Sequence, residues 1–202
     1  MKLGVLGGTF DPVHNGHLGI AGSACRQLDL ARVLFVPARQ PWLKGGRGIA
    51  PSLHRVEMIK LAILSDTRYN ISCVDLDREG PSYTVDTLSD LKREFGPAAE
   101  LYFILGMDAL EGLAGWREPG RIIAMCHLVV ASRPGVDMVD LKALEAKLPG
   151  ISEKVVVIDN ELYNINSTEI RRRVAAGLSI DGLVPDAVAR YIRDNGLYLE
   201  EV

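Results

Sequence analysis

Short apolar runs rich in β-branched residues alternate with segments of helical period along this chain. The runs predict six strands, at residues 2–6, 32–36, 69–74, 101–105, 127–132 and 155–158. The helical period predicts eight helices, at residues 16–28, 53–64, 85–95, 109–116, 121–125, 141–148, 168–176 and 186–194. Such alternation favours an α/β fold in which helices cover both faces of a doubly wound parallel sheet, with a small helical C-terminal end.

Length and composition limit the classes to which this chain can belong. Its 202 residues fit a single domain over residues 1–202, and 48% hydrophobic and 24% charged residues are typical of globular proteins. The net charge of -3 argues against a nucleic-acid surface built on bulk positive charge. Because no apolar stretch reaches about 18 residues, we expect no membrane span.

The three cysteines, Cys25, Cys73 and Cys126, are far apart and form no CxxC pair. This usage predicts reduced thiols in a cytoplasmic protein. Cys25 falls in a predicted helix and Cys73 in a predicted strand, so both are expected to be buried.

The segment Gly7–His17, GGTFDPVHNGH, directly follows the first predicted strand. Ligands bind at the carboxyl ends of strands in open α/β sheets. Paired glycines let a nucleotide approach the backbone, while Pro12 and Gly16 mark a turn into the next helix. His14 and His17 are three residues apart, so on a first helical turn they project to the same side. Two such imidazoles can donate hydrogen bonds to a polyphosphate, although a lone HxGH is as often a solvated loop.

A second polar motif, INSTEIR at residues 165–171, follows the last predicted strand. Ser167 or Thr168 is the expected N-cap of the helix, and Arg171 lies about one turn later on the same face. A phosphate at this helix start would meet backbone amides, hydroxyls and a guanidinium. A capped basic helix is ordinary by itself. The chain has neither a GxGxxG fingerprint nor a Walker P-loop.

Together and in this order, the two motifs resemble the nucleotidyltransferase superfamily that has HxGH near its start and STxxR or STxxK near its end. Within it, the chain is similar to the bacterial nicotinate mononucleotide adenylyltransferases over essentially its whole length. The shared features are GGTFDPVHNGH, PxxxPxxK at Pro37–Lys44, His54-Arg55, SYTVDTL at Ser82–Leu88, Gly106-Met107-Asp108 with the later Trp116, Arg133-Pro134-Gly135 and STEIR. The resemblance implies a Rossmann-like fold and Mg²⁺-dependent transfer of AMP from ATP to nicotinate mononucleotide, which yields deamido-NAD and pyrophosphate.

The resemblance also implies the residues of an ATP site. They are Gly7, Gly8, Thr9, Phe10, His14, His17, Gly106, Asp108, Ser167, Thr168 and Arg171. Catalytic contacts are implied for His14, His17, Arg171 and for Lys44, which lies in a predicted loop over residues 38–51. Arg47 is a weaker candidate for the role of Lys44. Gly106 and Asp108 are expected at the adenylate ribose, although Asp108 is equally suited to cap the helix that follows.

The implied nicotinate mononucleotide site consists of Lys44, Tyr83, Thr84, Trp116 and Arg117. Thr84 opens a predicted helix, which suits the nicotinate carboxylate. Trp116 offers a flat face to the pyridine ring, although a lone tryptophan is more often part of the core. No protein site for a metal is expected, because the chain has no carboxylate cluster and Mg²⁺ can arrive with the ATP phosphates.

The chain departs from the family pattern at three places. Asn166 replaces the first serine of the usual SSTxxR motif, although an asparagine amide can still donate a hydrogen bond. Arg117 stands where many relatives carry an aromatic residue, so it either adds charge near the nicotinate carboxylate or faces solvent. Trp42 and Leu43 alter the PPHK-like part of the loop.

Of the three arginines at 171–173, only Arg171 is expected to point inward. His54 fits an anchoring role as well as a ligand contact.

Three alternatives stay open beside this interpretation. A sister adenylyltransferase would act on nicotinamide mononucleotide or phosphopantetheine, although His14 in place of threonine counts against the latter. A class I aminoacyl-tRNA synthetase fragment would need a KMSKS-like loop and an anticodon domain, for which the chain has no room. A catalytically silent nucleotide-binding regulator would bind ATP without turnover. The expected partners are ATP and nicotinate mononucleotide, with no nucleic acid or membrane, and a homo-oligomer is left open.

Overall fold

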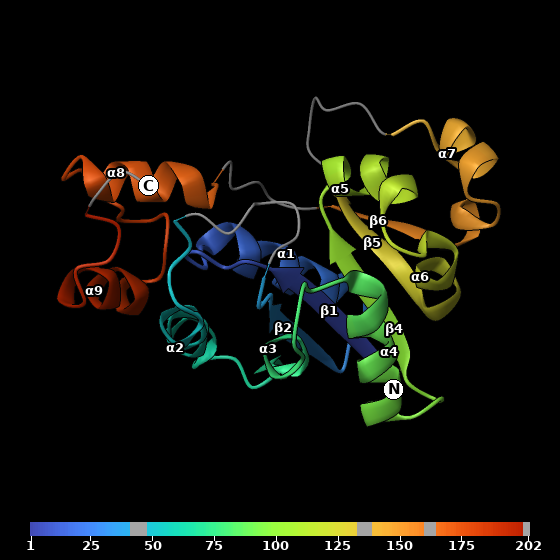
Figure 1. The fold of residues 1–202 in the computed structure, drawn as a ribbon, viewed down its shortest axis with the longest axis horizontal. Coiled ribbons are helices and arrows are strands. Elements are labelled where there is room, and N and C mark those ends of the chain that lie inside the picture. The colour runs from blue at the N-terminus through green and yellow to red at the C-terminus, as the bar shows by residue number, and fades with distance from the viewer. Residues whose placement is uncertain (41–47, 133–138, 160–164, 200–202) are drawn as a thin grey trace.

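A computed structural model describes residues 1–40, 48–132, 139–159 and 165–199 (Figure 1). Its strands are β1 (Lys2–Gly8), β2 (Arg32–Pro37), β3 (Tyr69–Ile71), β4 (Glu100–Leu105), β5 (Cys126–Ser132) and β6 (Val155–Asp159). Its α-helices are α1 (Asn15–Leu28), α2 (Ser52–Ile63), α3 (Val74–Asp77), α4 (Thr84–Phe95), α5 (Met107–Glu111), α6 (Pro119–Met125), α7 (Leu141–Lys147), α8 (Ser167–Ala175) and α9 (Asp186–Asp194). Two 3-10 turns, η1 (Gly112–Gly115) and η2 (Ile151–Glu153), complete the elements.

The six strands form one parallel sheet in the order β3-β2-β1-β4-β5-β6. Leu3 of β1 pairs with Arg32 of β2 on one side and with Leu101 of β4 on the other. The direction of strand succession therefore reverses between β1 and β4. This arrangement confirms the predicted doubly wound, Rossmann-like sheet, and it puts the expected ligand crevice outside the carboxyl ends of β1 and β4.

The central strands β1, β2, β4 and β5 are buried on both faces, and alternate side chains enter two separate apolar clusters. In β2, Val33 and Phe35 face one cluster, while Leu34 and Val36 face the other. The first cluster lies against α1, α2, α8 and α9, and the second against α4, α5, α6 and α7 (Figure 1). Burial on both faces explains why the strands appear in the sequence as continuous apolar runs.

Glycine is required within β1 itself. A Cβ atom at Gly4 would lie 2.8 Å from Val33 Cγ2 and 2.9 Å from Leu30 Cδ1. The missing side chain therefore allows Leu30, in the turn after α1, and the neighbouring strand to pack closely on β1.

Two predicted elements have different boundaries in the structure. The strand expected over residues 69–74 ends at Ile71, and Cys73 is the half-exposed N-cap of α3, so the prediction that it is buried in a strand was wrong. Asp75 in α3 is buried and accepts a hydrogen bond from Thr87 of α4. The chain therefore turns toward α4 after Ile71 instead of continuing the strand. The helix expected over residues 109–116 is the short α5 followed by η1, because glycines at 112 and 115 interrupt it.

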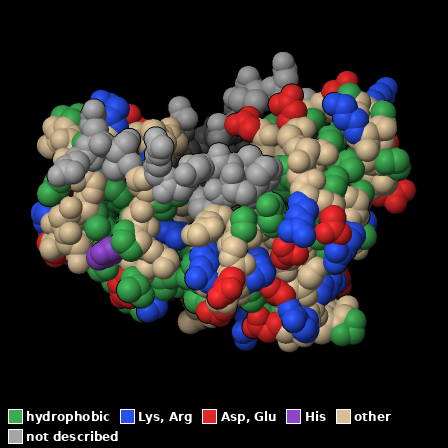
Figure 2. Space-filling model, viewed as in Figure 1, with side chains coloured by type: hydrophobic (Ala, Val, Ile, Leu, Met, Phe, Trp, Pro, Cys, Tyr) green, Lys and Arg blue, Asp and Glu red, His purple; other side chains and the backbone are tan. Residues whose placement is uncertain are grey.

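The C-terminal helices α8 and α9 form the predicted small helical end, and α9 packs against α2 (Figure 1). Within the described ranges, no helix is long and apolar enough to cross a membrane. On the face shown in Figure 2, acidic and basic side chains are intermixed over α4 and α6. That face therefore has no broad surface of one charge, which agrees with the small net charge of -3.

Candidate active site

The two histidines of the first motif stack on each other at the start of α1. His14 is the N-cap with an extended backbone, and its backbone N–H donates to Nδ1 of the His17 ring over 3.2 Å. The ring centroids are 3.7 Å apart. Because Nδ1 of His17 accepts this bond, the neutral ring carries its hydrogen on Nε2. The fold thus sets the tautomer in which Nε2 of His17 is a donor.

His14 is almost completely buried, and burial lowers its pKa from 6.5 to about 4. Its ring is therefore neutral at pH 7. Among the described residues, Nδ1 of His14 has no hydrogen-bond partner. A Cβ atom at Gly16 would lie 3.0 Å from this nitrogen, so the glycine of HxGH makes room for the His14 ring.

The loop between β1 and α1 is held from below by a buried arginine. Arg55 of α2 is 2% exposed, and it donates from Nη1 to the carbonyl oxygen of Thr9 over 2.8 Å and from Nε to that of Ala50 over 3.0 Å. Phe10 lies in the left-handed region at φ 51°, with its ring buried against His17 and Phe35. The side chain of Phe10 therefore faces the core, which leaves its backbone as the part available to a ligand.

The closing motif packs directly on this loop, although about 160 residues separate them in the sequence. Ser167 donates from Oγ to the carbonyl oxygen of Pro12 over 3.0 Å. Arg171 donates from Nη1 to the carbonyl oxygen of Asp11 over 2.8 Å, and its side chain stays one quarter exposed. The fold thereby brings the two predicted phosphate motifs together at one edge of the sheet.

Asn166 is the N-cap of α8, so the expectation that Ser167 or Thr168 would cap the helix was wrong. Oδ1 of Asn166 accepts the N–H of Glu169 over 2.8 Å. This arrangement leaves Ser167 to anchor the loop, while Oγ1 of Thr168 lies 3.4 Å from Nη2 of Arg171. The replacement of a serine by Asn166 keeps the cap, because asparagine is as good an N-cap as serine.

Only the first arginine of the 171–173 run faces the loop. Arg172 and Arg173 both pair with Glu169 on the outer side of α8. The predicted inward orientation of Arg171 alone is therefore confirmed by its contacts with Asp11.

A second set of predicted residues follows β4, across the point where strand succession reverses. Gly106 is exposed and is the N-cap of α5, while Asp108 is the exposed second residue of that helix. The alternative role of Asp108 as the N-cap is therefore wrong. Trp116 follows η1 and is half-buried, with its ring edge-on to Phe103 at 6.2 Å between centroids. Trp116 therefore packs against the core through Phe103, while part of its side chain stays exposed.

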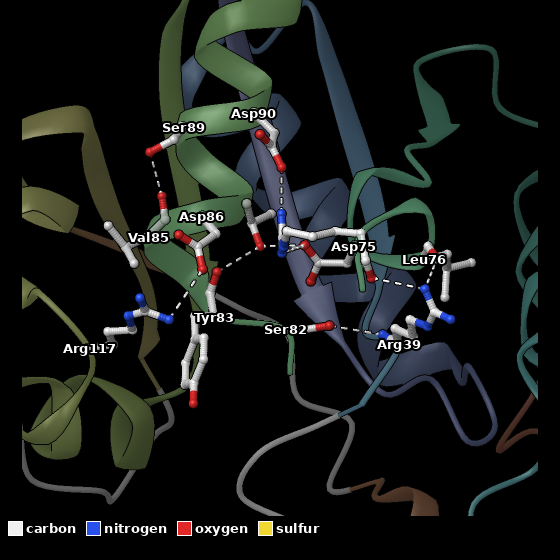
Figure 3. A network of polar contacts seen from close by, with 12 residues as sticks. Arg39, Asp75, Leu76, Ser82, Tyr83, Val85, Asp86, Ser89, Asp90 and Arg117 are labelled. Carbon is white, nitrogen blue, oxygen red and sulfur yellow. Dashed lines mark hydrogen bonds and ion pairs between the residues drawn. The ribbon is translucent and has the colours of Figure 1, made fainter. Parts of the chain in front are cut away.

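Tyr83 and Arg117 lie beside each other at the start of α4 (Figure 3). Tyr83 is the N-cap and Thr84 the first residue of the helix. The Arg117 guanidinium lies 4.7 Å from the centroid of the Tyr83 ring, and its Nη1 is 3.8 Å from Oδ2 of Asp86. Arg117 is thus half-exposed but held over the tyrosine ring, beside the helix start that was predicted to receive a carboxylate.

The buried carboxylate of Asp75 connects the segment before α4 to that helix (Figure 3). Oδ1 of Asp75 accepts hydrogen bonds from Oγ1 of Thr87 over 2.6 Å and from Nη2 of Arg78 over 2.7 Å. Burial raises the pKa of Asp75, while these donors oppose that change. Arg78 also pairs with Asp90, so α3, the loop at 78–83 and α4 are joined by one network.

The same loop is bound to the end of β2. The backbone N–H of Arg39 donates to Oγ of Ser82 over 2.9 Å, and the N–H of Ser82 donates to the carbonyl oxygen of Gln40 over 3.1 Å. The predicted residues Lys44 and Arg47, together with Trp42 and Leu43, lie outside the described residues.

A family model described as cytidylyltransferase-like matches residues 5–173. A probable nicotinate-nucleotide adenylyltransferase of Thermomicrobium roseum is 46% identical over 197 residues, which cover 98% of this chain and 91% of that protein. One from Dehalococcoides mccartyi is 40% identical and covers 98% and 97% of the two chains. The chain belongs to the nicotinate-nucleotide adenylyltransferase family.

Solved structures agree with this adenylyltransferase fold. A Plasmodium falciparum nicotinic acid mononucleotide adenylyltransferase complexed with NaAD has a TM-score of 0.78 at 21% identity, over 98% of this chain and 99% of that one. The same protein complexed with APC has a TM-score of 0.77 at 19% identity. At such low identity the likeness concerns the fold, which confirms the Rossmann-like architecture expected for the family.

Sequence reasoning assigned no role to three residues that support the site of this adenylyltransferase family member. They are Asp11, Arg55 and Tyr198. For Arg55 a signal existed, because its spacing to Met58, Ile59 and Ala62 puts it on the buried face of the helix. Asp11 and Tyr198 had no such local signal, since their contact joins positions 187 residues apart.

Proposed function

We propose that this protein transfers AMP from ATP to nicotinate mononucleotide and releases pyrophosphate. One observation carries the proposal: the HxGH loop after β1 and the STEIR helix meet through Ser167 and Arg171 at the crevice of the sheet. Both motifs present phosphate-binding groups to that crevice. Relatives of 40–46% identity named as probable nicotinate-nucleotide adenylyltransferases support the reaction class.

The reaction needs positioning and charge neutralisation more than it needs a base. An oxygen of the mononucleotide phosphate attacks the α-phosphorus of ATP, the bond from that phosphorus to the bridging oxygen breaks, and pyrophosphate leaves opposite the new bond. The attacking oxygen is already anionic, so no proton has to be removed. Donors aimed at the phosphates therefore supply most of the catalysis.

His17 is the first donor in this proposal. The bond from His14 N–H to Nδ1 of His17 keeps the hydrogen on Nε2, which suits a phosphate oxygen whose negative charge grows in the transition state. His14, neutral and buried beside it, supplies a second polar ring. The backbone of Gly7, Gly8, Thr9 and Phe10 lines the same loop.

Arg171 and Thr168 face the phosphates from α8, and the start of that helix adds its backbone N–H groups. Ser167 contributes by fixing the helix to Pro12, so a direct phosphate contact is not needed for it to matter. Lys44 belongs to the proposal through the family likeness, as a cation for the leaving pyrophosphate.

The acceptor side lies between α4 and α5. Thr84 at the start of α4 is suited to the nicotinate carboxylate, and Arg117 over Tyr83 adds positive charge beside it. The half-buried Trp116 offers a ring to the pyridine. Asp108, exposed on α5, is suited to accept hydrogen bonds from the adenylate ribose, next to the backbone of Gly106.

Mg²⁺ is proposed to enter with ATP. Within the described part of the chain, no three histidine, cysteine or acidic residues are grouped to hold a metal ion. These residues therefore do not form a cage for Mg²⁺, and the ATP phosphates are its proposed ligands. We also propose a cytoplasmic location, where the free thiols Cys25, Cys73 and Cys126 would stay reduced.

The direct test is pyrophosphate release from ATP and Mg²⁺ in the presence of nicotinate mononucleotide, nicotinamide mononucleotide or phosphopantetheine. Strong preference for the nicotinate substrate supports the proposal. Equal rates with the amide would keep the chemistry and reject the specificity. ATP binding without release of pyrophosphate from any of the three would instead identify a silent nucleotide-binding protein.

A further inference from the structure

Tyr198, close to the C-terminus, reaches the loop that precedes α1. Its side chain is buried in the cluster that contains Phe10 and Val13, and its hydroxyl donates to Oδ1 of Asp11 over 2.6 Å. Its backbone adopts φ 62°, in the left-handed region that a bulky residue rarely occupies. A tyrosine in such a conformation indicates that its side chain is held by something more specific than local backbone preference.

The carboxylate of Asp11 is buried, and its two oxygens have different surroundings. Oδ1 accepts both the Tyr198 hydroxyl and, over 3.2 Å, the backbone N–H of Ala50. Oδ2 lies 3.9 Å from Nη1 of Arg171, which is beyond hydrogen-bond distance. Instead, this Nη1 donates to the Asp11 carbonyl oxygen over 2.8 Å.

The Arg171 guanidinium therefore lies next to a buried carboxylate but makes no hydrogen bond to its oxygens. A buried carboxylate that loses a donor recruits another, because an unsatisfied charge in the interior is costly. The Arg171 guanidinium is a cation within reach of Asp11. A shift of that group toward Oδ2 would withdraw it from the crevice.

We propose that Tyr198 is a positioning residue for ATP. Its hydroxyl satisfies Asp11, so that Arg171 stays turned to the triphosphate and the loop before α1 keeps its place. This inference rests on the proposed function only in taking Arg171 as a phosphate ligand. It links the C-terminal segment to the nucleotide site through contacts that span 187 and 160 residues of sequence.

The first experiment replaces the hydroxyl alone. Tyr198→Phe keeps the ring in its apolar cluster, and we expect it to raise the KM for ATP about five- to tenfold, as expected when one charged contact is weakened. We also expect kcat to fall, because Arg171 faces phosphates whose negative charge grows in the transition state, whereas the KM for nicotinate mononucleotide should stay within about twofold. An unchanged KM for ATP in a folded Tyr198→Phe variant would overturn the inference.

Tyr191→Phe is the matched control. It removes a tyrosine hydroxyl from the neighbouring helix α9, where that group lies 3.0 Å from Nδ1 of His54. Its KM for ATP should equal that of the unaltered protein. An equal rise in both variants would mean that any loosening of the C-terminal helices has this effect, and the specific role of Tyr198 would be rejected.

A double-mutant cycle tests the route through Asp11. In an Asp11→Asn background the side chain is neutral and no longer attracts Arg171, so Tyr198→Phe should cause little further change in ATP affinity. The same fold-change in both backgrounds would reject the route. Direct titration with ATP gives a Kd for every variant without turnover, so the inference can fail or hold separately from the proposed acceptor substrate.

Discussion

His17 is oriented by its neighbours before any ligand binds. The N–H of His14 directs Nδ1 inward as an acceptor, and the ring of Phe10 packs edge-on at 5.0 Å between centroids. A donor held in this way needs little reorganisation when charge develops on a phosphate. The value of the residue lies in its fixed tautomer and orientation.

We predict that His17→Ala lowers kcat about a hundredfold or more, since loss of a transition-state donor typically has this effect. The folded structure should persist, because His17 is only half-buried. Steady-state pyrophosphate release and a thermal melt check both parts. His127→Ala is the control, since this histidine lies at the amino end of β5, stacked on Tyr102. Near-normal turnover of His17→Ala would remove the residue from the mechanism.

Arg117 is predicted to help select the acid substrate. Arg117→Ala should raise the KM for nicotinate mononucleotide about fivefold and leave that for the amide unchanged, because an exposed charge contact contributes roughly 1 kcal/mol. Arg121→Ala serves as control, since Arg121 is similarly exposed and pairs with Glu118 over 2.6 Å, whereas Arg117 lies over the Tyr83 ring. Parallel measurements with the two mononucleotides decide the matter, and equal changes for both would mean that Arg117 only packs on Tyr83.

At the scale of elements, the start of α8 combines stability with ligand geometry. Asn166 caps the helix, Ser167 fixes it to Pro12, and Arg171 projects from its next turn. The orientation of the helix therefore decides where the guanidinium lies. In the same way, Asp75 joins α3 to α4 by accepting a hydrogen bond from Thr87. The Thr87 hydroxyl also contacts the carbonyl oxygen of Tyr83, the N-cap of α4.

Asn166→Ala should lower the free energy of unfolding by about 1 kcal/mol and raise the KM for ATP, because the N-cap bond is lost where the phosphates are proposed to bind. Asn166→Ser should retain both properties. Asp140→Ala is the matched control, because Asp140 caps α7 through bonds to the N–H groups of Lys142 and Ala143. Urea unfolding should show a similar loss for Asp140→Ala, whereas kinetics should show no change in KM. A normal KM in Asn166→Ala would separate the cap from the nucleotide site.

At the scale of the whole molecule, burial of His14 makes folding sensitive to acid. Its pKa is about 4 in the folded protein against 6.5 for an exposed histidine, so between these values the unfolded chain binds a proton that the folded chain does not. Stability therefore falls as the pH is lowered from 6.5 toward 4. The sign is that of a neutral group whose charging favours unfolding.

His14→Asn lacks this titration. Between pH 7 and pH 5, the unaltered protein should lose about 2 kcal/mol more of its free energy of unfolding than the variant does. Urea denaturation at a series of pH values measures this difference in the free energy of unfolding. Both proteins contain the same carboxylates, so the effect of their titration cancels in the comparison. Parallel curves over this range would show that the pKa of His14 is the same in the folded and unfolded states, and would contradict the prediction.

The order of residues is enough to predict a doubly wound parallel sheet and to place the two phosphate motifs directly after its strands. Strands buried on both faces appear as apolar runs, and parallel strands bring the segments after β1 and β6 to the same edge. Residue spacing also put His14 beside His17. These are local or periodic properties, which the order of residues contains directly.

The contacts that support those motifs could not be predicted from residue order, because they join segments that are distant in the sequence. Asn166 rather than Ser167 caps α8, because the hydroxyl of Ser167 is used by Pro12. The end of β3 depends on the burial of Asp75 against α4, and Asp11 is satisfied by Tyr198. Each of these outcomes depends on partners brought together from distant parts of the sequence. A polar residue's role in the interior is set by which donor or acceptor reaches it, and that information arises only when the chain has packed.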